Sequence, residues 1–162
     1  MPDKRSAGLL LFRRTAAGDT VEVLIGHMGG PFWAARDEAA WSIPKGEYGP
    51  EETPEAAAAR EFQEELGLPA PAGVRVPLGE ARQSSGKTVT VWAVEADLDP
   101  ARAVFGTFTM EWPRGSGTLR TFPELDRIGW FTPPRATPLL VKGQRIFLER
   151  LASHLAERGA ET

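Results

Sequence analysis

Residues 46–68 read GEYGPEETPEAAAAREFQEELGL, and this stretch predicts a short helix between two loops. Thr53 belongs to the residue types that cap helix N-termini, and Pro54 suits the first helical position. Gly67 suits the left-handed conformation in which many helices end. Between these signals, apolar residues recur at i,i+4 spacing and predict the face that packs on the core: Ala58, Phe62 and Leu66.

Three glutamates lie on another face of the same predicted helix. Glu61 and Glu65 are four residues apart, and Glu64 lies beside them. Like charges at this spacing repel one another unless positive charge lies among them. Because carboxylate oxygens are the ligands that hard cations prefer, the pattern predicts a divalent-metal site, most simply for Mg²⁺.

The complete stretch resembles the signature of the Nudix hydrolases. That signature is a glycine, five residues, a glutamate, seven residues, Arg-Glu, an apolar residue, any residue, Glu-Glu, any residue, a glycine and an apolar residue. Because seven positions are fixed and two more must be apolar, a chance match is on the order of one in a billion per starting position. Every position is matched here, by Gly46, Glu52, Arg60, Glu61, Phe62, Glu64, Glu65, Gly67 and Leu68.

The resemblance implies a fold and a set of metal ligands. The expected fold is α+β, a Nudix-like α/β/α sandwich with a mixed central sheet and the motif as loop–helix–loop, in one domain over residues 1–162. Glu61 and Glu65 are expected to bind the metal directly, Glu64 directly or through water, and Gly46 through its carbonyl. The expected cofactor is Mg²⁺, with Mn²⁺ as an alternative.

The resemblance also implies roles for the other two charged motif residues. Glu52 is expected to orient the loop or the Arg60 side chain. Arg60 is expected to pair with Glu52 rather than touch the substrate, since a guanidinium group can bind a carboxylate through two parallel hydrogen bonds. A clamp on the substrate phosphates is the alternative role for Arg60.

A further carboxylate is expected later in the chain. Many Nudix enzymes take it, as base or ligand, from a loop shortly before the last strand, and Phe122–Arg127 has that position here. Glu124 is the favoured residue, and Glu111 and Asp126 compete with it. Glu64 is another candidate for the catalytic base.

Two lysines are candidates for binding phosphate groups. Trp41–Gly46 reads WSIPKG and resembles the W-x-x-P-K-G lead-in of the diadenosine polyphosphate and diphosphoinositol polyphosphate branch. Lys45 would there meet phosphate oxygens. Lys87 ends Gln83–Lys87, which could form a hydrogen-bonding loop beside it.

Aromatic residues are candidates for stacking on a nucleobase, because stacking does not depend on base identity. Each of them also fits the ordinary role of core filler. Of the two histidines, His27 is expected near the pocket and His154 on the surface of a C-terminal helix. The aromatic candidates are Phe32, Trp33, Phe108 and Trp112.

Composition excludes several classes of protein. With 41% hydrophobic and 25% charged residues, the chain is ordinary for a globular protein. A net charge of −3 argues against a nucleic-acid partner, which needs a clustered basic face. The sequence shows neither a long apolar run for a membrane span nor a secretion signal. The absence of cysteine excludes disulfides and fits the expected cytoplasmic location. Monomer and homodimer both stay open.

Turn signals and periodicity predict the remaining elements. His27–Ala35 is expected to be a loop, and Pro44 and Gly46 are expected to keep the chain out of a strand before the helix. Phe105–Trp112 fits either a strand or an ordered loop. Strands are expected at Gly8–Arg13 and Val21–Ile25, joined as a hairpin through Thr15–Asp19, and at Val74–Glu80, Thr88–Ala96 and Arg127–Phe131, with a turn at Arg114–Gly117 and a helix at Gln144–Arg158.

The expected reaction follows from the charge of its substrate. A pyrophosphate repels both an attacking water and the nearby carboxylates, and bound metal ions relieve this repulsion. We therefore expect a Mg²⁺-dependent Nudix pyrophosphohydrolase that cleaves a nucleoside diphosphate linked to another moiety, most simply a dinucleoside polyphosphate or a nucleoside triphosphate. ADP-ribose or a nucleotide sugar is the alternative substrate. A nucleotide-sensing module without catalysis is the alternative from another functional class.

Overall fold

The computed structural model describes residues 4–15, 18 and 20–160. Its centre is a seven-stranded mixed sheet in the order β3-β2-β1-β6-β5, with β4 paired to β1 and β9 paired to β2. β1 and β6 run parallel, whereas the other pairs among these strands are antiparallel. The strands are β1 (Arg5–Arg14), β2 (Val21–Met28), β3 (Trp41–Ser42), β4 (Lys45–Glu47), β5 (Val76–Arg82), β6 (Thr88–Glu95) and β9 (Leu125–Phe131).

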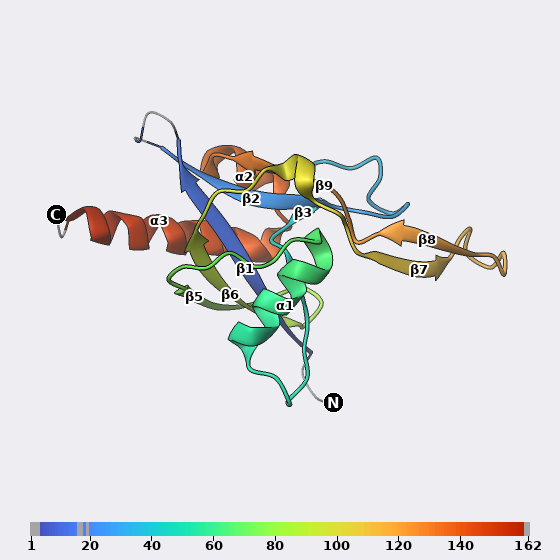
Figure 1. Ribbon diagram of the computed structural model, residues 1–162. Coiled ribbons are helices and arrows are strands. Elements are labelled where there is room, and N and C mark those ends of the chain that lie inside the picture. The colour runs from blue at the N-terminus through green and yellow to red at the C-terminus, as the bar shows by residue number, and fades with distance from the viewer. Residues whose placement is uncertain (1–3, 16–17, 19, 161–162) are drawn as a thin grey trace.

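Helices cover both faces of this sheet (Figure 1). On β1, alternate side chains point to opposite faces, as the pleat of a strand requires. Leu9 and Leu11 pack with Phe62 of α1 (Pro54–Leu66). On the other face, the buried cluster of β1 and β2 includes Phe147 and Leu151 of α3 (Arg145–Ala160) and Ala136 of α2 (Pro133–Leu139). The expected α+β fold, with a mixed sheet between helices, is confirmed.

The motif helix α1 begins and ends as expected. The Thr53 hydroxyl accepts a hydrogen bond from the Ala56 N–H at 3.2 Å and so caps the N-terminus. Gly67 is left-handed, with φ of 66°, and donates to the Gln63 carbonyl. Ala57 and Ala58 pack on Ala7 of β1, and their small side chains let the helix approach the strand closely.

A second, two-stranded sheet projects from the body of the molecule (Figure 1). It is a hairpin of β7 (Thr107–Glu111) and β8 (Leu119–Pro123), paired from Thr107↔Pro123 to Glu111↔Leu119. Gly115 and Gly117 both have positive φ in the turn that joins the strands. The ambiguous segment at residues 105–112 is therefore mainly strand. Two 3₁₀ turns, Pro100–Arg102 and Lys142–Gln144, complete the structure.

Several sequence-based boundaries were wrong. His27 and Met28 continue β2 instead of opening a loop, because β9 pairs with them. Gly46 lies within strand β4, because pairing with β1 outweighs its low strand propensity. β8 and α2 were not predicted. The β1–β2 pairing is confirmed, although residues 16, 17 and 19 of its expected connection lie outside the described residues.

Among the described residues, none of the helices combines the length and the apolar character that a membrane crossing needs.

Candidate active site

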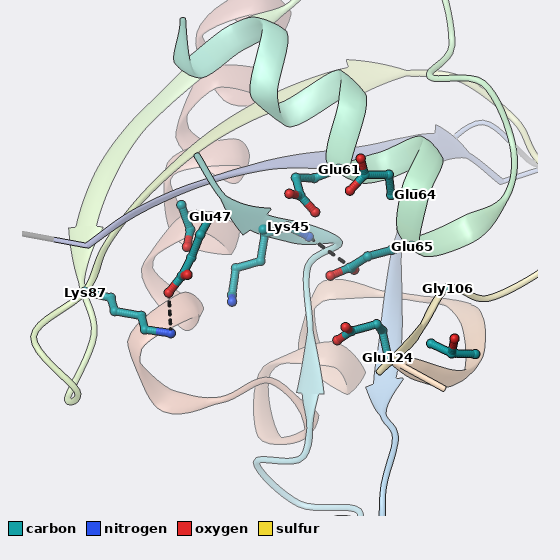
Figure 2. Close-up of a pocket in the computed structure, with 11 residues that line it drawn as sticks. Lys45, Glu47, Glu61, Glu64, Glu65, Lys87, Gly106 and Glu124 are labelled. Atoms are coloured by element: carbon teal, nitrogen blue, oxygen red, sulfur yellow. Dashed lines mark hydrogen bonds and ion pairs between the residues drawn. The ribbon is translucent and has the colours of Figure 1, made fainter. Parts of the chain in front are cut away.

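A cavity of about 450 Å³ lies beside α1 (Figure 2). α1 contributes three glutamates to one side, and the hairpin strand β7 begins on another side. Two lysines reach the same space from β4 and from the turn before β6. The lining residues are Ser6, Lys45, Gly46, Glu47, Glu61, Glu64, Glu65, Lys87, Gly106, Thr107 and Glu124.

The position of the α1 carboxylates depends on the neighbouring strand β4. A Cβ atom on Gly46 would collide with the Glu61 carboxylate, so glycine is needed for this close approach. The register Ala7↔Gly46 fixes β4 on β1 at that point. The Glu61 side chain is 13% exposed and Glu64 is 58% exposed, so the carboxylates line the cavity from its depth to its rim.

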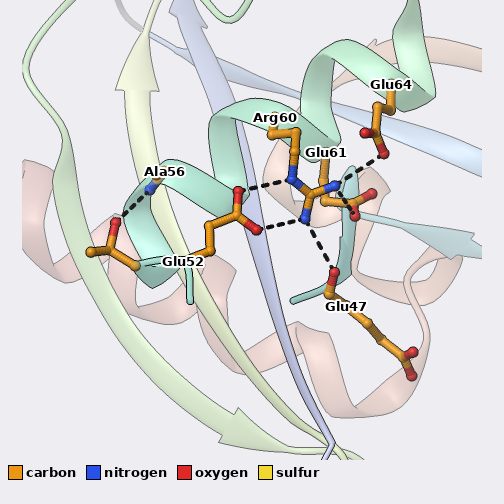
Figure 3. Close-up of polar contacts among 7 residues, drawn as sticks. Glu47, Glu52, Ala56, Arg60, Glu61 and Glu64 are labelled. Carbon is orange, nitrogen blue, oxygen red and sulfur yellow. Dashed lines mark hydrogen bonds and ion pairs between the residues drawn. The ribbon is translucent and has the colours of Figure 1, made fainter. Parts of the chain in front are cut away.

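Arg60 is the centre of a polar network beside these carboxylates (Figure 3). Its Nε and Nη2 donate to the two carboxylate oxygens of Glu52 at 2.8 and 2.9 Å. Its Nη1 donates to Glu61 at 2.8 Å and to Glu64 at 3.1 Å, and Nη2 also reaches the carbonyl of Glu47 at 3.3 Å. Arg60 therefore contacts two of the expected metal ligands as well as Glu52.

Burial disfavours the charged forms of the deepest groups. It raises the pKa of Glu65, with Glu124 and Glu61 adding to the rise and Lys45 opposing it. It also raises the pKa of Glu61, against the opposing effect of Arg60. Burial lowers the pKa of Lys45, against the attraction of Glu65. Added positive charge in the cavity would stabilise the ionised carboxylates.

The donor set of the cavity fits a hard divalent cation, since it consists of carboxylate and carbonyl oxygens. Within residues 4–15, 18 and 20–160, however, no three acidic or histidine side chains converge tightly enough to coordinate one ion. Instead, the Arg60 guanidinium donates to carboxylate oxygens of Glu61 and Glu64 (Figure 3). Coordination would require these carboxylates to turn away from Arg60.

Of the three late carboxylates, Glu124 is the one that lies in the cavity lining. It sits between β8 and β9, and its N–H donates to the Gly106 carbonyl at 2.7 Å. Glu111 accepts a hydrogen bond from the Gly115 N–H in the hairpin turn. Asp126 lies 2.8 Å from Nδ1 of His27. The geometry therefore favours Glu124 over the other two.

Both histidines differ from expectation. His27 is buried between Asp126 and the Arg36 carbonyl, so it supports the fold instead of lining the cavity. His154 is partly buried rather than on the surface, and its Nε2 has no hydrogen-bond partner among the described residues.

A second cavity of about 340 Å³ adjoins the first, because Lys45, Glu65 and Glu124 line both. Trp33 and Phe108 are among its walls, so two of the four aromatic candidates meet at one space. Its remaining lining residues are Met28, Gly29, Ser42 and Leu125.

The other two aromatic candidates lie elsewhere. Phe32 is 60% exposed under the Arg36 guanidinium. Trp112 directly follows β7 in the hairpin, and its backbone N–H donates to the Thr118 carbonyl.

The two lysines make different contacts. The Lys45 N–H donates to Glu65 at 3.3 Å, and the Lys87 Nζ lies 2.9 Å from a carboxylate oxygen of Glu47. In the expected loop Gln83–Lys87, the Gln83 side chain donates to the Gly143 carbonyl. Of this loop, Lys87 alone lines the cavity.

Sequence reasoning missed four lining residues: Ser6, Glu47, Gly106 and Thr107. Glu47 follows the motif glycine directly, which is the one local signal that could have identified it. Ser6 reaches the cavity through the pairing of β1 with β4 and β6. Gly106 and Thr107 reach it where the chain enters the β7–β8 hairpin.

Comparisons with known proteins identify the family of this chain. A model of the NUDIX domain matches residues 3–151. No curated protein sequence shows significant similarity to the chain.

Solved structures share the fold at low sequence identity. A binary complex of the C. elegans Ap4A hydrolase has a TM-score of 0.65 and 19% identity, covering 95% of this chain and 98% of that one. A mutT/nudix family protein from Listeria innocua has a TM-score of 0.65 and 20% identity, covering 100% and 99%. The NUDIX domain of Shewanella oneidensis NrtR, complexed with ADP ribose, has a TM-score of 0.60 and 12% identity, covering 96% and 90%. Because the domain model spans most of the sequence, the chain belongs to the Nudix family of hydrolases.

Proposed function

We propose that this chain is a Mg²⁺-dependent pyrophosphohydrolase that cleaves a phosphoanhydride bond of a nucleoside diphosphate linked to another moiety. Dinucleoside polyphosphates and nucleoside triphosphates are the proposed substrate classes. One observation carries the proposal: a single cavity combines the glutamates of α1 with Lys45 and Lys87. Hard cations and cationic side chains both neutralise the charge of a polyphosphate. The glutamates of the cavity can bind such a cation, and the two lysines supply the cationic side chains.

Glu61, Glu64, Glu65 and the Gly46 carbonyl would hold the Mg²⁺. Bound Mg²⁺ neutralises charge on phosphate oxygens and lowers the pKa of a water molecule. Arg60 acts as a positioning residue, since its two hydrogen bonds to Glu52 keep it in place when Glu61 and Glu64 turn to other partners.

Glu124 is the proposed general base. Its carboxylate takes a proton from the attacking water while the water oxygen forms a bond to phosphorus. The bridging P–O bond breaks, and the leaving phosphate keeps that bonding pair. Glu64 is the alternative base, because it also lines the cavity and its side chain is more than half exposed.

The second cavity would take a nucleoside. Trp33 and Phe108 offer aromatic surfaces beside Lys45, so a base could stack there while its phosphates enter the first cavity. The WSIPKG lead-in and the structural similarity to an Ap4A hydrolase support a dinucleoside polyphosphate. The similarity to a domain complexed with ADP ribose makes ADP-ribose the second candidate. We further infer one Nudix domain over residues 1–162 and a cytoplasmic location.

A substrate panel tests the proposal. The purified protein is incubated with Mg²⁺ and diadenosine polyphosphates, nucleoside triphosphates, ADP-ribose or diphosphoinositol polyphosphates, and the products are separated by ion exchange. Turnover of the first two classes supports the proposal, and the product pair identifies the bond cleaved. Turnover confined to ADP-ribose would favour the second candidate. Nucleotide binding without turnover of any compound would contradict catalysis and favour a sensing module.

A further inference from the structure

Ser6 is a buried residue of the cavity that the proposed reaction does not use. It lies on β1, where that strand pairs with Glu47 of β4 on one side and Val89 of β6 on the other. The residue is 1% exposed and lines the main cavity. Its hydroxyl has no hydrogen-bond partner within the described part of the chain. Buried hydroxyls are rarely left unpaired, so a water molecule or a ligand in the cavity must supply the partner of this group.

Ser6 lies close in the strand pattern to both lysines of the cavity. Lys87 directly precedes Thr88, whose N–H donates to the Lys4 carbonyl at 3.0 Å and whose Cα partner is Arg5. Lys45 is paired with Gly8, two residues along β1 from Ser6. The end of β1 therefore brings one hydroxyl and two ammonium groups to the same cavity.

Lys87 lies apart from the catalytic carboxylates, whereas Lys45 lies between Lys87 and Glu65. Figure 2 shows Lys87 and Glu47 on one side of the cavity, with Glu64, Glu124 and Gly106 on the other. A linear polyphosphate could therefore extend from the carboxylates, where a bond is cleaved, towards the lysines.

We propose that Ser6, Lys45 and Lys87 form a subsite for a phosphate group beyond the diphosphate that is cleaved. The inference rests on the proposed function and deepens it, since it assigns the enzyme to substrates with at least three consecutive phosphates. A phosphate offers only acceptor oxygens, and these three side chains supply donors. The phosphate would give the Ser6 hydroxyl the hydrogen-bond partner that the protein does not provide.

Glu47 opposes this binding. Its carboxylate forms an ion pair with Lys87 at 2.9 Å, and the two side chains are 51% and 38% exposed. Exposed ion pairs are weak, so a phosphate with higher charge can displace the Glu47 carboxylate. Removing the charge of Glu47 should therefore strengthen polyphosphate binding, whereas removing the Ser6 hydroxyl or the Lys87 charge should weaken it.

The test compares Ser6→Ala, Lys87→Gln and Glu47→Gln with the unaltered protein in Mg²⁺. The substrates are diadenosine di-, tri- and tetraphosphate, which differ only in phosphate number. Ser6→Ala and Lys87→Gln should raise KM for the tri- and tetraphosphate by about 5- to 10-fold, the effect of losing one hydrogen bond, and leave KM for the diphosphate nearly unaltered. Glu47→Gln should lower KM for the two longer substrates.

Two controls separate this role from a structural one. Ser85→Ala and Lys142→Gln change exposed residues of the same types and should leave all three KM values unaltered. Ser6→Ala should keep or raise the melting temperature, because it removes an unpaired buried hydroxyl. If Ser6→Ala lowers the melting temperature and affects all three substrates equally, the subsite is wrong.

Calorimetry with inorganic tripolyphosphate and pyrophosphate in Mg²⁺ tests the subsite without turnover. Ser6→Ala should weaken tripolyphosphate binding and leave pyrophosphate binding unaltered. If the unaltered protein hydrolyses none of the substrates, the proposed function is wrong. If Ser6→Ala even then weakens the binding of tripolyphosphate and not of pyrophosphate, the subsite is still supported. Equal affinity of variant and unaltered protein for tripolyphosphate would overturn the subsite even in an active enzyme.

Discussion

The two walls of the cavity are held in different ways. The helix wall, which consists of β4 and α1, is fixed by a capped helix, by the contact of Gly46 with Glu61, and by the Arg60 network. The hairpin wall, residues 106–124, belongs to a two-stranded sheet that projects from the body (Figure 1). Isolated two-stranded hairpins have marginal stability, so this wall depends on its attachment.

The attachment of the hairpin wall lies at its root. The Gly106 N–H donates to the Glu65 carbonyl at 3.2 Å, and the Gly29 N–H donates to the Glu124 carbonyl at 3.0 Å. Glu124 and Phe108 lie near this root, beside the carboxylates of α1. We infer that the two walls have different roles: the helix wall would bind metal, whereas the hairpin wall would supply the base and select the substrate.

The largest expected effect comes from a ligand of the helix wall. Glu65→Gln should lower kcat by at least about 100-fold, because even residues that only orient metal ligands contribute 10- to 100-fold. It should also abolish the rise in melting temperature that Mg²⁺ produces in the unaltered protein. Glu55→Gln, on an exposed first-turn position of α1, is the matched control. Near-normal turnover of Glu65→Gln would contradict its assignment as a ligand.

The next effect tests the base on the hairpin wall. Glu124→Gln should lower kcat by about 100-fold, the lower range for loss of a general base. Asp126→Asn should leave kcat close to that of the unaltered protein, while it lowers the melting temperature because buried His27 loses its carboxylate partner. Both quantities are measured on both variants. If Asp126→Asn lowers kcat and Glu124→Gln does not, Asp126 is the general base instead of Glu124.

The helix wall was predictable because its signals are local. Thr53, Pro54 and Gly67 set the ends of α1, and the spacing of the glutamates put them on one face. Even there, local reasoning did not show that Arg60 would hold Glu61 and Glu64 as well as Glu52. That outcome depends on distances between side chains in the folded chain and on the balance of charge around Arg60.

The hairpin wall was less predictable because its contacts are distant in sequence. Leu119–Pro123 becomes a strand through pairing with β7, and its own alternation of apolar residues is weak. Pro133–Leu139 forms a helix although it contains three prolines, since two of them occupy the first helical positions, where no N–H is needed. Ser6 gave no signal, because its lack of a partner exists only in the folded sheet.

Two glycines allow the walls to be perturbed one at a time. A Cβ at Gly46 would collide with the Glu61 carboxylate, and a Cβ at Gly29 with the Pro123 carbonyl. Gly46→Ala should lower kcat by roughly 10-fold through misplacement of Glu61. Gly29→Ala should mainly raise KM and lower the melting temperature, because the backbone of the hairpin wall must move. Steady-state kinetics and thermal melting of both variants check this division, and identical effects on kcat and KM would contradict it.

The smallest expected effect concerns the nucleoside. Phe108 lines the second cavity and lies 5.9 Å, between ring centroids, from Phe122 of the facing strand. Phe108→Leu keeps an apolar side chain but loses the aromatic face, so KM for a dinucleoside polyphosphate should rise about fivefold, the lower range for loss of one stacking contact. The affinity for inorganic tripolyphosphate should not alter, because that ligand has no base.

Leu119→Ala is the matched control for Phe108→Leu, since Leu119 is 71% exposed on the same hairpin. Its KM should equal that of the unaltered protein. A rise in KM for Leu119→Ala as large as that for Phe108→Leu would mean that the hairpin wall acts through its overall stability. A rise specific to Phe108→Leu, with tripolyphosphate binding preserved, would instead place base recognition on the hairpin wall and leave phosphate recognition to β1, β4 and the turn before β6.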